Sequence, residues 1–113
     1  MSVDQLSSVF SALADPTRRA ILARLTHGDA TVGDLTAPFN VSQPAISRHL
    51  KVLEQAGLVS WYARATARLS RLEAGPLRDA TVWLAGYREY WDESYDRLAG
   101  LLADLRDEQR DAP

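Results

Sequence analysis

Hydrogen-bonding and cationic side chains are concentrated in the stretch SQPAISRHLKVLEQAGLV, residues 42–59. The Gln43 amide and the Arg48 guanidinium can each make paired hydrogen bonds, and the Lys51 ammonium attracts anions. No catalytic constellation accompanies them, because the chain has no cysteine, its two histidines are well separated, and no glycine-rich phosphate loop is present. These residue types indicate recognition of a polar, anionic partner rather than an enzyme.

One short helix over about 42–56 is predicted to carry these side chains. Ser42 is a good N-cap, Pro44 falls in the first turn, where its missing N–H costs little, and Gly57 suits a left-handed C-cap. At 100° per residue, its apolar and polar side chains point in different directions. The apolar set is Ile46, Leu50 and Leu53, and the polar set is Gln43, Ser47, Arg48 and Lys51. The helix is therefore expected to pack with one face and present the other.

Three further helices are expected before this one. Apolar residues at helical spacing predict a helix over 3–14, and Asp15 followed by Pro16 caps a second helix that stops before Gly28. Thr31 and Asp34 form a capping box for a short third helix. A short helix, a turn and the helix 42–56 together indicate a helix-turn-helix over about 31–56, whose second helix enters the major groove of DNA.

After residue 57 the hydrophobic period changes. Residues 58–72 contain two β-prone stretches around ARAT, and they predict a two-stranded hairpin, although no Asn-Gly or Asp-Gly marks its tip. Residues 42–72 carry five cations and one acid, a net charge of +4, whereas residues 73–113 carry five arginines and ten acids, a net charge of −5. A basic middle segment favours an anionic partner there.

Residues 75–108 are predicted to form one long helix that begins at Gly75-Pro76. Apolar residues recur in an a/d pattern over four heptads, and a helix of this length, about 50 Å, cannot bury such a stripe against so small a body. A second copy of the chain is the simplest cover, so we expect a homodimer. The residues 109–113 are expected to form a disordered tail.

The sequence resembles the ArsR family of bacterial winged-helix transcription regulators from about Leu6 to Leu105. The fragments that carry the resemblance are ALADPTRRAIL at 12–22, TVGDL at 31–35, SQPAISRHLKVLEQAGLV at 42–59 and LEAGPLRDA at 72–80. It implies a mostly α fold with a small β-hairpin, a winged helix-turn-helix with a long C-terminal dimerisation helix, in one domain over 1–108. It also implies a homodimeric repressor that binds operator double-stranded DNA.

The resemblance also implies roles for particular residues. The hairpin 58–72 would be the wing, and the helices 3–14 and 75–108 would pair the subunits. The implied DNA-binding residues are Ser42, Gln43, Ser47, Arg48, His49, Lys51, Arg64, Arg68 and Arg71. The implied dimer contacts are Leu6, Phe10, Leu84, Tyr87, Trp91, Leu98 and Leu101. A structural, hydrogen-bonded role for His49 is an equal alternative to a phosphate contact.

Two features depart from the family pattern. The stretch SWYA at 60–63 occupies a position that is usually basic, and Ala65 occupies the usual glycine position of the wing, so Arg64 and Thr66 are weaker candidates for minor-groove contacts. With no cysteine and only His27 and His49, no metal or other cofactor is expected. Exposed surface and phosphate contact are the alternatives for Arg18 and Arg19.

The composition bounds the remaining possibilities. At 113 residues, 46% hydrophobic and 25% charged, the chain is typical of a cytoplasmic globular protein with no membrane span and no secretory signal. A winged helix that binds only proteins is the alternative function. Three alternatives remain for the signal that releases the repressor. They are a small organic ligand at the aromatic cluster 83–95, a partner protein, and autoregulation without a ligand.

Overall fold

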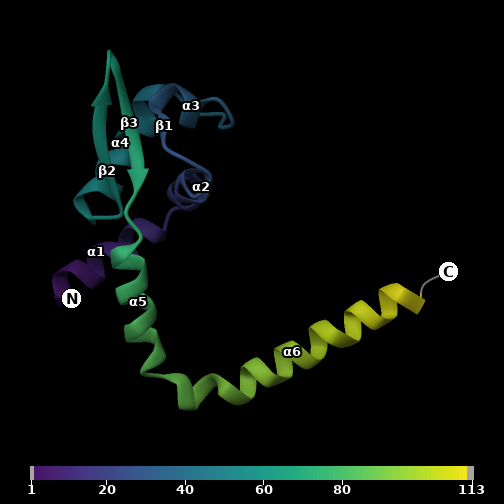
Figure 1. Cartoon of the computed structure of the whole chain (residues 1–113). Helices are drawn as coiled ribbons and strands as arrows, with labels where there is room; N and C mark the ends of the chain where they lie inside the picture. The colour runs from purple at the N-terminus through teal and green to yellow at the C-terminus, as the bar shows by residue number, and fades with distance from the viewer. Residues whose placement is uncertain (1, 112–113) are drawn as a thin grey trace. The chain divides into compact units, whose positions relative to one another are not determined.

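The computed structural model describes residues 2–111, and the side chains of Val3, Glu89, Trp91 and residues 109–111 lie outside the described set. The chain divides into two compact units, Met1–Ala80 and Thr81–Pro113. The elements of the first unit are α1 (Val3–Leu13), α2 (Pro16–Leu25), β1 (Ala30–Thr31), α3 (Val32–Thr36), α4 (Gln43–Gln55), β2 (Val59–Arg64) and β3 (Ala67–Leu72) (Figure 1). They are followed by α5 (Gly75–Ala85) and α6 (Arg88–Asp111). The predicted helix-turn-helix and hairpin both lie in the first unit.

The predicted helix starts are confirmed by their caps. The Asp15 carboxylate accepts the N–H of Arg18 at 3.0 Å, and the Ser42 hydroxyl accepts the N–H of Ala45 at 3.3 Å. Gly57 follows α4 with φ +77°, a left-handed conformation that glycine adopts without a steric penalty. Local sequence signals therefore set the start of α2 and both ends of α4.

The core of the first unit is formed by apolar side chains of its helices and of the sheet. Its largest fully buried side chains are Val9, Ile21, Leu35, Ile46, Leu53 and Leu58. Burial of each such side chain contributes roughly 1.5–3 kcal/mol relative to exposure. The apolar face predicted for the helix 42–56 is confirmed as part of this core, since Ile46, Leu50 and Leu53 are all buried.

The predicted hairpin is confirmed, and a third strand joins it. Strands β2 and β3 pair antiparallel from Val59 opposite Leu72 to Arg64 opposite Ala67. The two-residue strand β1 pairs with β3 on its other edge, giving the order β1-β3-β2. Strand β1 could not be predicted from the sequence, because two residues are too few to show an alternating pattern. Figure 1 shows the hairpin tip extending beyond the helices of this unit.

The prediction of one uninterrupted helix over 75–108 is wrong at residues 86 and 87. The N–H groups of Gly86 and Tyr87 donate to the carbonyls of Trp83 and Leu84 at 3.1 and 3.0 Å, three residues back instead of four. Glycine has the lowest helix propensity after proline, so the interruption at Gly86 costs little. Helix α6 then continues through Asp111, into the segment expected as a disordered tail, and residues 112 and 113 lie outside the described residues.

The hairpin tip predicts a stabilising substitution. Ala65, the first of the two loop residues, has φ +53°, a conformation that costs an L-residue roughly 1 kcal/mol. We expect Ala65→Gly to raise the free energy of unfolding by about 0.5 kcal/mol, after the larger backbone entropy of glycine is counted. Urea unfolding followed by circular dichroism measures the change. Ala63→Gly, within β2, is the control and should destabilise; an unchanged or lower midpoint for Ala65→Gly contradicts strain at the tip.

Candidate nucleic-acid interface

The polar face of α4 is open to solvent. Gln43, Ser47, Arg48 and Lys51 are all exposed, and Ser42 is exposed at the N-cap. Within the described residues, neither Arg48 nor Lys51 lies within ion-pair distance of an acid. These side chains form one row, and their donors are available to an incoming partner.

Helix α3 begins with a capping box and packs against α4 through the core. The Thr31 hydroxyl accepts the N–H of Asp34 at 3.1 Å, and the Asp34 carboxylate accepts the N–H of Thr31 at 3.1 Å. The hydrogen bond from the Thr31 backbone lowers the pKa of Asp34 below its ordinary value. Leu35 is fully buried in the core that also holds Ile46 of α4. Together, α3 and α4 form the predicted helix-turn-helix.

His49 is set apart from the exposed row. Its ring Nδ1 lies 3.3 Å from Nη1 of Arg18 and 3.9 Å from the Asp15 carboxylate, and only 23% of its side chain is exposed. Arg18 in turn donates from Nε to the carbonyl of Ala12 at 2.8 Å and from Nη2 to that of Ser11 at 3.1 Å. This arrangement favours the structural alternative for His49, which links α4 to the end of α1.

Arg18 and Arg19 both bind carbonyl groups at the C-terminal end of α1. Arg19 donates to the carbonyl of Leu13 at 2.7 Å, beside the two bonds of Arg18. Helix C-termini carry unpaired carbonyls and a partial negative charge, so guanidinium groups are favourable there. These contacts give the two arginines a defined structural role that the sequence analysis did not assign.

Two of the three wing arginines have acidic partners. Arg68 lies 3.2 Å from a carboxylate oxygen of Glu54, on α4, and Arg71 lies 3.5 Å from Asp29. Arg64 is exposed at the end of β2, and no ion pair is found for it among the described side chains. Neither pair could be predicted from the sequence, because each joins residues that are distant in the chain.

Tyr62 also contacts Asp29, the partner of Arg71. Its hydroxyl donates to Asp29 at 2.7 Å, and the Arg71 guanidinium lies 4.8 Å from the centre of its ring. The hydrogen bond to the Asp29 carboxylate raises the pKa of Tyr62 above its ordinary value. The cluster ties the wing to the segment before β1, so Arg71 has partners within the protein.

The described residues contain no group of three or more His, Cys, Asp and Glu side chains able to hold a metal ion. None of the helices searched in this part of the chain is long and apolar enough to cross a membrane. The geometry is that of an exposed row of donors on a helix, flanked by a β-hairpin. Such a surface can present hydrogen-bond donors to base edges and cations to phosphates.

Comparison with known proteins assigns the family. Residues 15–60 match the model of the bacterial regulatory protein arsR family. The HTH-type transcriptional regulator Rv2034 of Mycobacterium tuberculosis is 40% identical over 102 residues, which cover 90% of this chain and 89% of that protein. The chain belongs to the ArsR family. It is a winged helix-turn-helix DNA-binding transcriptional regulator, as the sequence resemblance predicted.

Two further comparisons agree with this assignment. The transcriptional repressor SdpR of Bacillus subtilis is 39% identical over 82 residues, 73% of this chain and 91% of that protein. The homodimeric winged helix-turn-helix DNA-binding domain of Mb0332 from Mycobacterium bovis superposes with a TM-score of 0.62 at 27% identity, covering 84% of this chain and 85% of that one. The fold class predicted for this ArsR-family chain is confirmed.

The cap of α2 predicts a pH dependence of stability for this ArsR-family regulator. The Arg18 backbone hydrogen bond holds the pKa of Asp15 below its ordinary value of 3.8, against the opposing effect of burial. A lowered folded pKa stabilises the fold above the ordinary value, and that contribution is lost as the pH falls through the folded pKa. We therefore expect Asp15→Ala to lower the melting temperature at pH 7 and to lower it less at pH 3.

Asp15→Asn is the matched control, because asparagine caps a helix equally well and carries no charge. Its difference from the wild type should shrink toward zero at pH 3. Thermal unfolding between pH 3 and pH 7 measures both series. If the difference in melting temperature between Asp15→Ala and the wild type grows as the pH falls, the lowered pKa of Asp15 in the folded protein is contradicted.

Proposed function

We propose that this chain is a homodimeric repressor that binds operator DNA with sequence specificity through α4 and the wing. The observation that supports this most strongly is the exposed row of Gln43, Ser47, Arg48 and Lys51, opposite a buried apolar face. A helix held by one face and carrying free donors on the other suits the major groove.

Each member of the row suits a different part of the duplex. The Gln43 amide can pair with an adenine edge, and the Arg48 fork can pair with a guanine edge. Ser42, Ser47 and Lys51 suit backbone phosphates, which position the protein without reading sequence. Arg64, exposed at the wing, is a further phosphate contact in this proposal, whereas His49 holds α4 through Arg18.

An exposed apolar stripe on α6 supports the homodimer. Leu98, Leu101, Leu102 and Leu105 recur at helical spacing and are 46–57% exposed. Stripes of this kind are usually covered by another helix, and the Mb0332 domain with the same fold is homodimeric. The proposed interface also includes Leu6, Phe10, Leu84 and Tyr87; the side chain of Trp91, predicted to join them, lies outside the described residues.

A module that binds only proteins is the second candidate, and the unpaired cations of α4 argue against it. We propose that the chain has no enzymatic activity and uses no cofactor. The proposed site of action is the bacterial cytoplasm, where operator DNA is found. The proposed effector is a small organic molecule or a partner protein, and autoregulation without a ligand is the alternative.

Substitutions in the row should separate base reading from phosphate contact. After selection of bound duplexes from a random library, Gln43→Ala or Arg48→Ala should weaken the selected duplex about tenfold and relax base preference. Lys51→Ala should weaken all duplexes alike and reduce the slope of log K against log salt by about 0.9 per subunit, which is about 1.8 for the homodimer. Fluorescence anisotropy over a salt series measures these effects.

Arg106→Ala, an exposed arginine of α6, is the control for loss of one positive charge and should leave base preference unchanged. If the wild type binds duplex no better than an acidic protein of equal size, the DNA-binding proposal fails and the protein-binding module takes its place. Unchanged binding in all three α4 variants would remove this helix from the interface.

The α6 stripe gives a separate prediction about assembly. The double substitution Leu98→Glu with Leu101→Glu should convert the dimer to a monomer at micromolar concentration, because buried, unpaired charges are costly. Sedimentation velocity measures the mass. Ala103→Glu, about 140° around the helix from Leu98, is the matched control and should remain dimeric. A wild-type chain that sediments as a monomer contradicts the dimer.

A further inference from the structure

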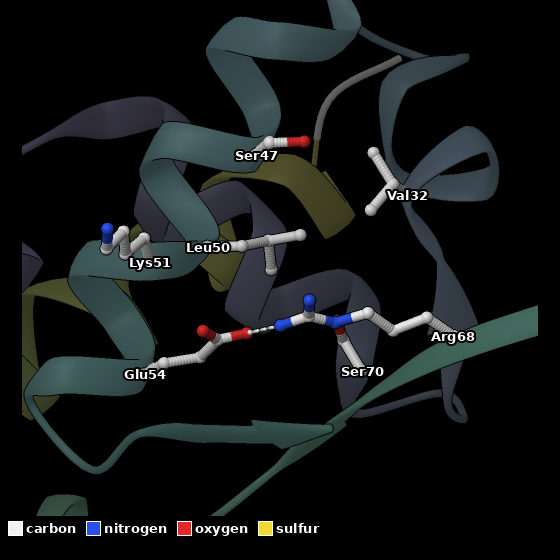
Figure 2. A pocket seen from close by; sticks show the side chains of 7 residues that line it. All are labelled: Val32, Ser47, Leu50, Lys51, Glu54, Arg68 and Ser70. Carbon is white, nitrogen blue, oxygen red and sulfur yellow. Dashed lines mark hydrogen bonds and ion pairs between the residues drawn. The ribbon is translucent and has the colours of Figure 1, made fainter. Parts of the chain in front are cut away.

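Arg68, on β3 of the wing, makes one contact with α4 and one with the neighbouring strand β2. Its Nη2 atom lies 3.2 Å from Oε1 of Glu54, and its guanidinium carbon lies 3.9 Å from the centre of the Trp61 ring. Figure 2 shows the Arg68 side chain reaching from β3 to the Glu54 carboxylate. The pair is accessible to water, since 52% of the Arg68 side chain and 24% of the Glu54 side chain are exposed. Exposed pairs of this kind are weak, so another anion can replace the carboxylate.

A cleft of about 310 Å³ lies between α4 and the wing beside this pair. Its lining residues, shown in Figure 2, are Val32, Ser47, Leu50, Lys51, Glu54, Arg68 and Ser70. The cations Lys51 and Arg68 and the exposed hydroxyl of Ser47 lie on this surface against one carboxylate, that of Glu54. The lining therefore offers hydrogen-bond donors to an anion, and Glu54 is the group that opposes its entry.

The dimensions of DNA place this cleft at the edge of the major groove. The groove is about 12 Å wide and an α-helix with its side chains is about 10–12 Å across, so α4 alone fills it. A wing packed on the flank of α4 must then meet the sugar-phosphate strand that borders the groove. The nearest anions to Arg68 in such a complex are backbone phosphates.

We propose that Arg68 exchanges Glu54 for a DNA backbone phosphate when α4 enters the groove. Glu54 is then an internal competitor that lowers the affinity for every duplex and holds Arg68 in place in the free protein. Because phosphates carry no sequence information, the exchange changes affinity and leaves base preference unchanged. This inference rests on the proposed function, since it requires α4 to bind in the major groove.

The test compares duplex binding by Glu54→Gln, Arg68→Met and the double variant in the full chain. Glutamine keeps the shape of Glu54 without its charge, and methionine keeps much of the Arg68 stem against Trp61. Glu73→Gln is the matched control, because Glu73 accepts a hydrogen bond from the Ser60 hydroxyl at 2.7 Å and lines no part of the cleft. Anisotropy with a 30-base-pair duplex of arbitrary sequence and with a selected duplex, over a salt series, gives the affinities. Thermal unfolding confirms that each variant is folded.

We expect Glu54→Gln to tighten binding to both duplexes by roughly three- to tenfold, and Arg68→Met to reduce the salt slope by about 0.9 per subunit, which is about 1.8 for the homodimer. In the Arg68→Met background the gain from Glu54→Gln should disappear, and Glu73→Gln should change affinity little. Unchanged or weaker binding by Glu54→Gln overturns the exchange and leaves the pair as a structural link. An equal gain in the Arg68→Met background, or from Glu73→Gln, reduces the effect to net charge and also overturns it. Loss of wild-type binding to all duplexes is a different result, which contradicts the proposed function itself.

Discussion

Burial of the apolar face of α4 is the constraint on which the rest of this surface depends. Ile46, Leu50 and Leu53 are almost fully enclosed in the core, so α4 cannot rotate about its axis without exposing them. That fixed rotation turns Arg48 and Lys51 toward solvent. The contact of His49 with Arg18 and Asp15 holds the same helix from another side. Base recognition requires donors at fixed positions, and the core supplies that rigidity.

The wing differs from α4 in how its charges are used. The cations of α4 have no acidic partner among the described side chains, whereas Arg68 and Arg71 are paired with Glu54 and Asp29. An ion pair orders the long arginine side chain, but its carboxylate also competes with any other anion for the guanidinium group. In the proposed complex with DNA, Arg48 and Lys51 would contact the duplex directly, whereas Arg68 and Arg71 would first have to leave their carboxylate partners. The strained Ala65 at the tip shows that the hairpin keeps its two-residue turn without glycine.

Signals that act within a few residues made much of the fold predictable. The N-caps at Asp15 and Ser42, the Thr31–Asp34 capping box and the left-handed Gly57 are all present as expected, because each depends on hydrogen bonds or φ angles within one turn. The hairpin also lies where its β-prone residues placed it. The prediction of one helix over 75–108 was wrong at Gly86. The heptad pattern continues through this position, although glycine has a low helix propensity.

The sequence by itself determined the helix-turn-helix, the hairpin and the row of donors on α4, because the 3.6-residue period fixes which side chains share a face. Only the tertiary structure decided what those side chains meet. The short strand β1, the pairs Glu54–Arg68 and Asp29–Arg71, and the contact of Arg18 with His49 join residues 14 to 42 positions apart. Such contacts depend on how elements pack in three dimensions, and one sequence carries no local pattern that records them.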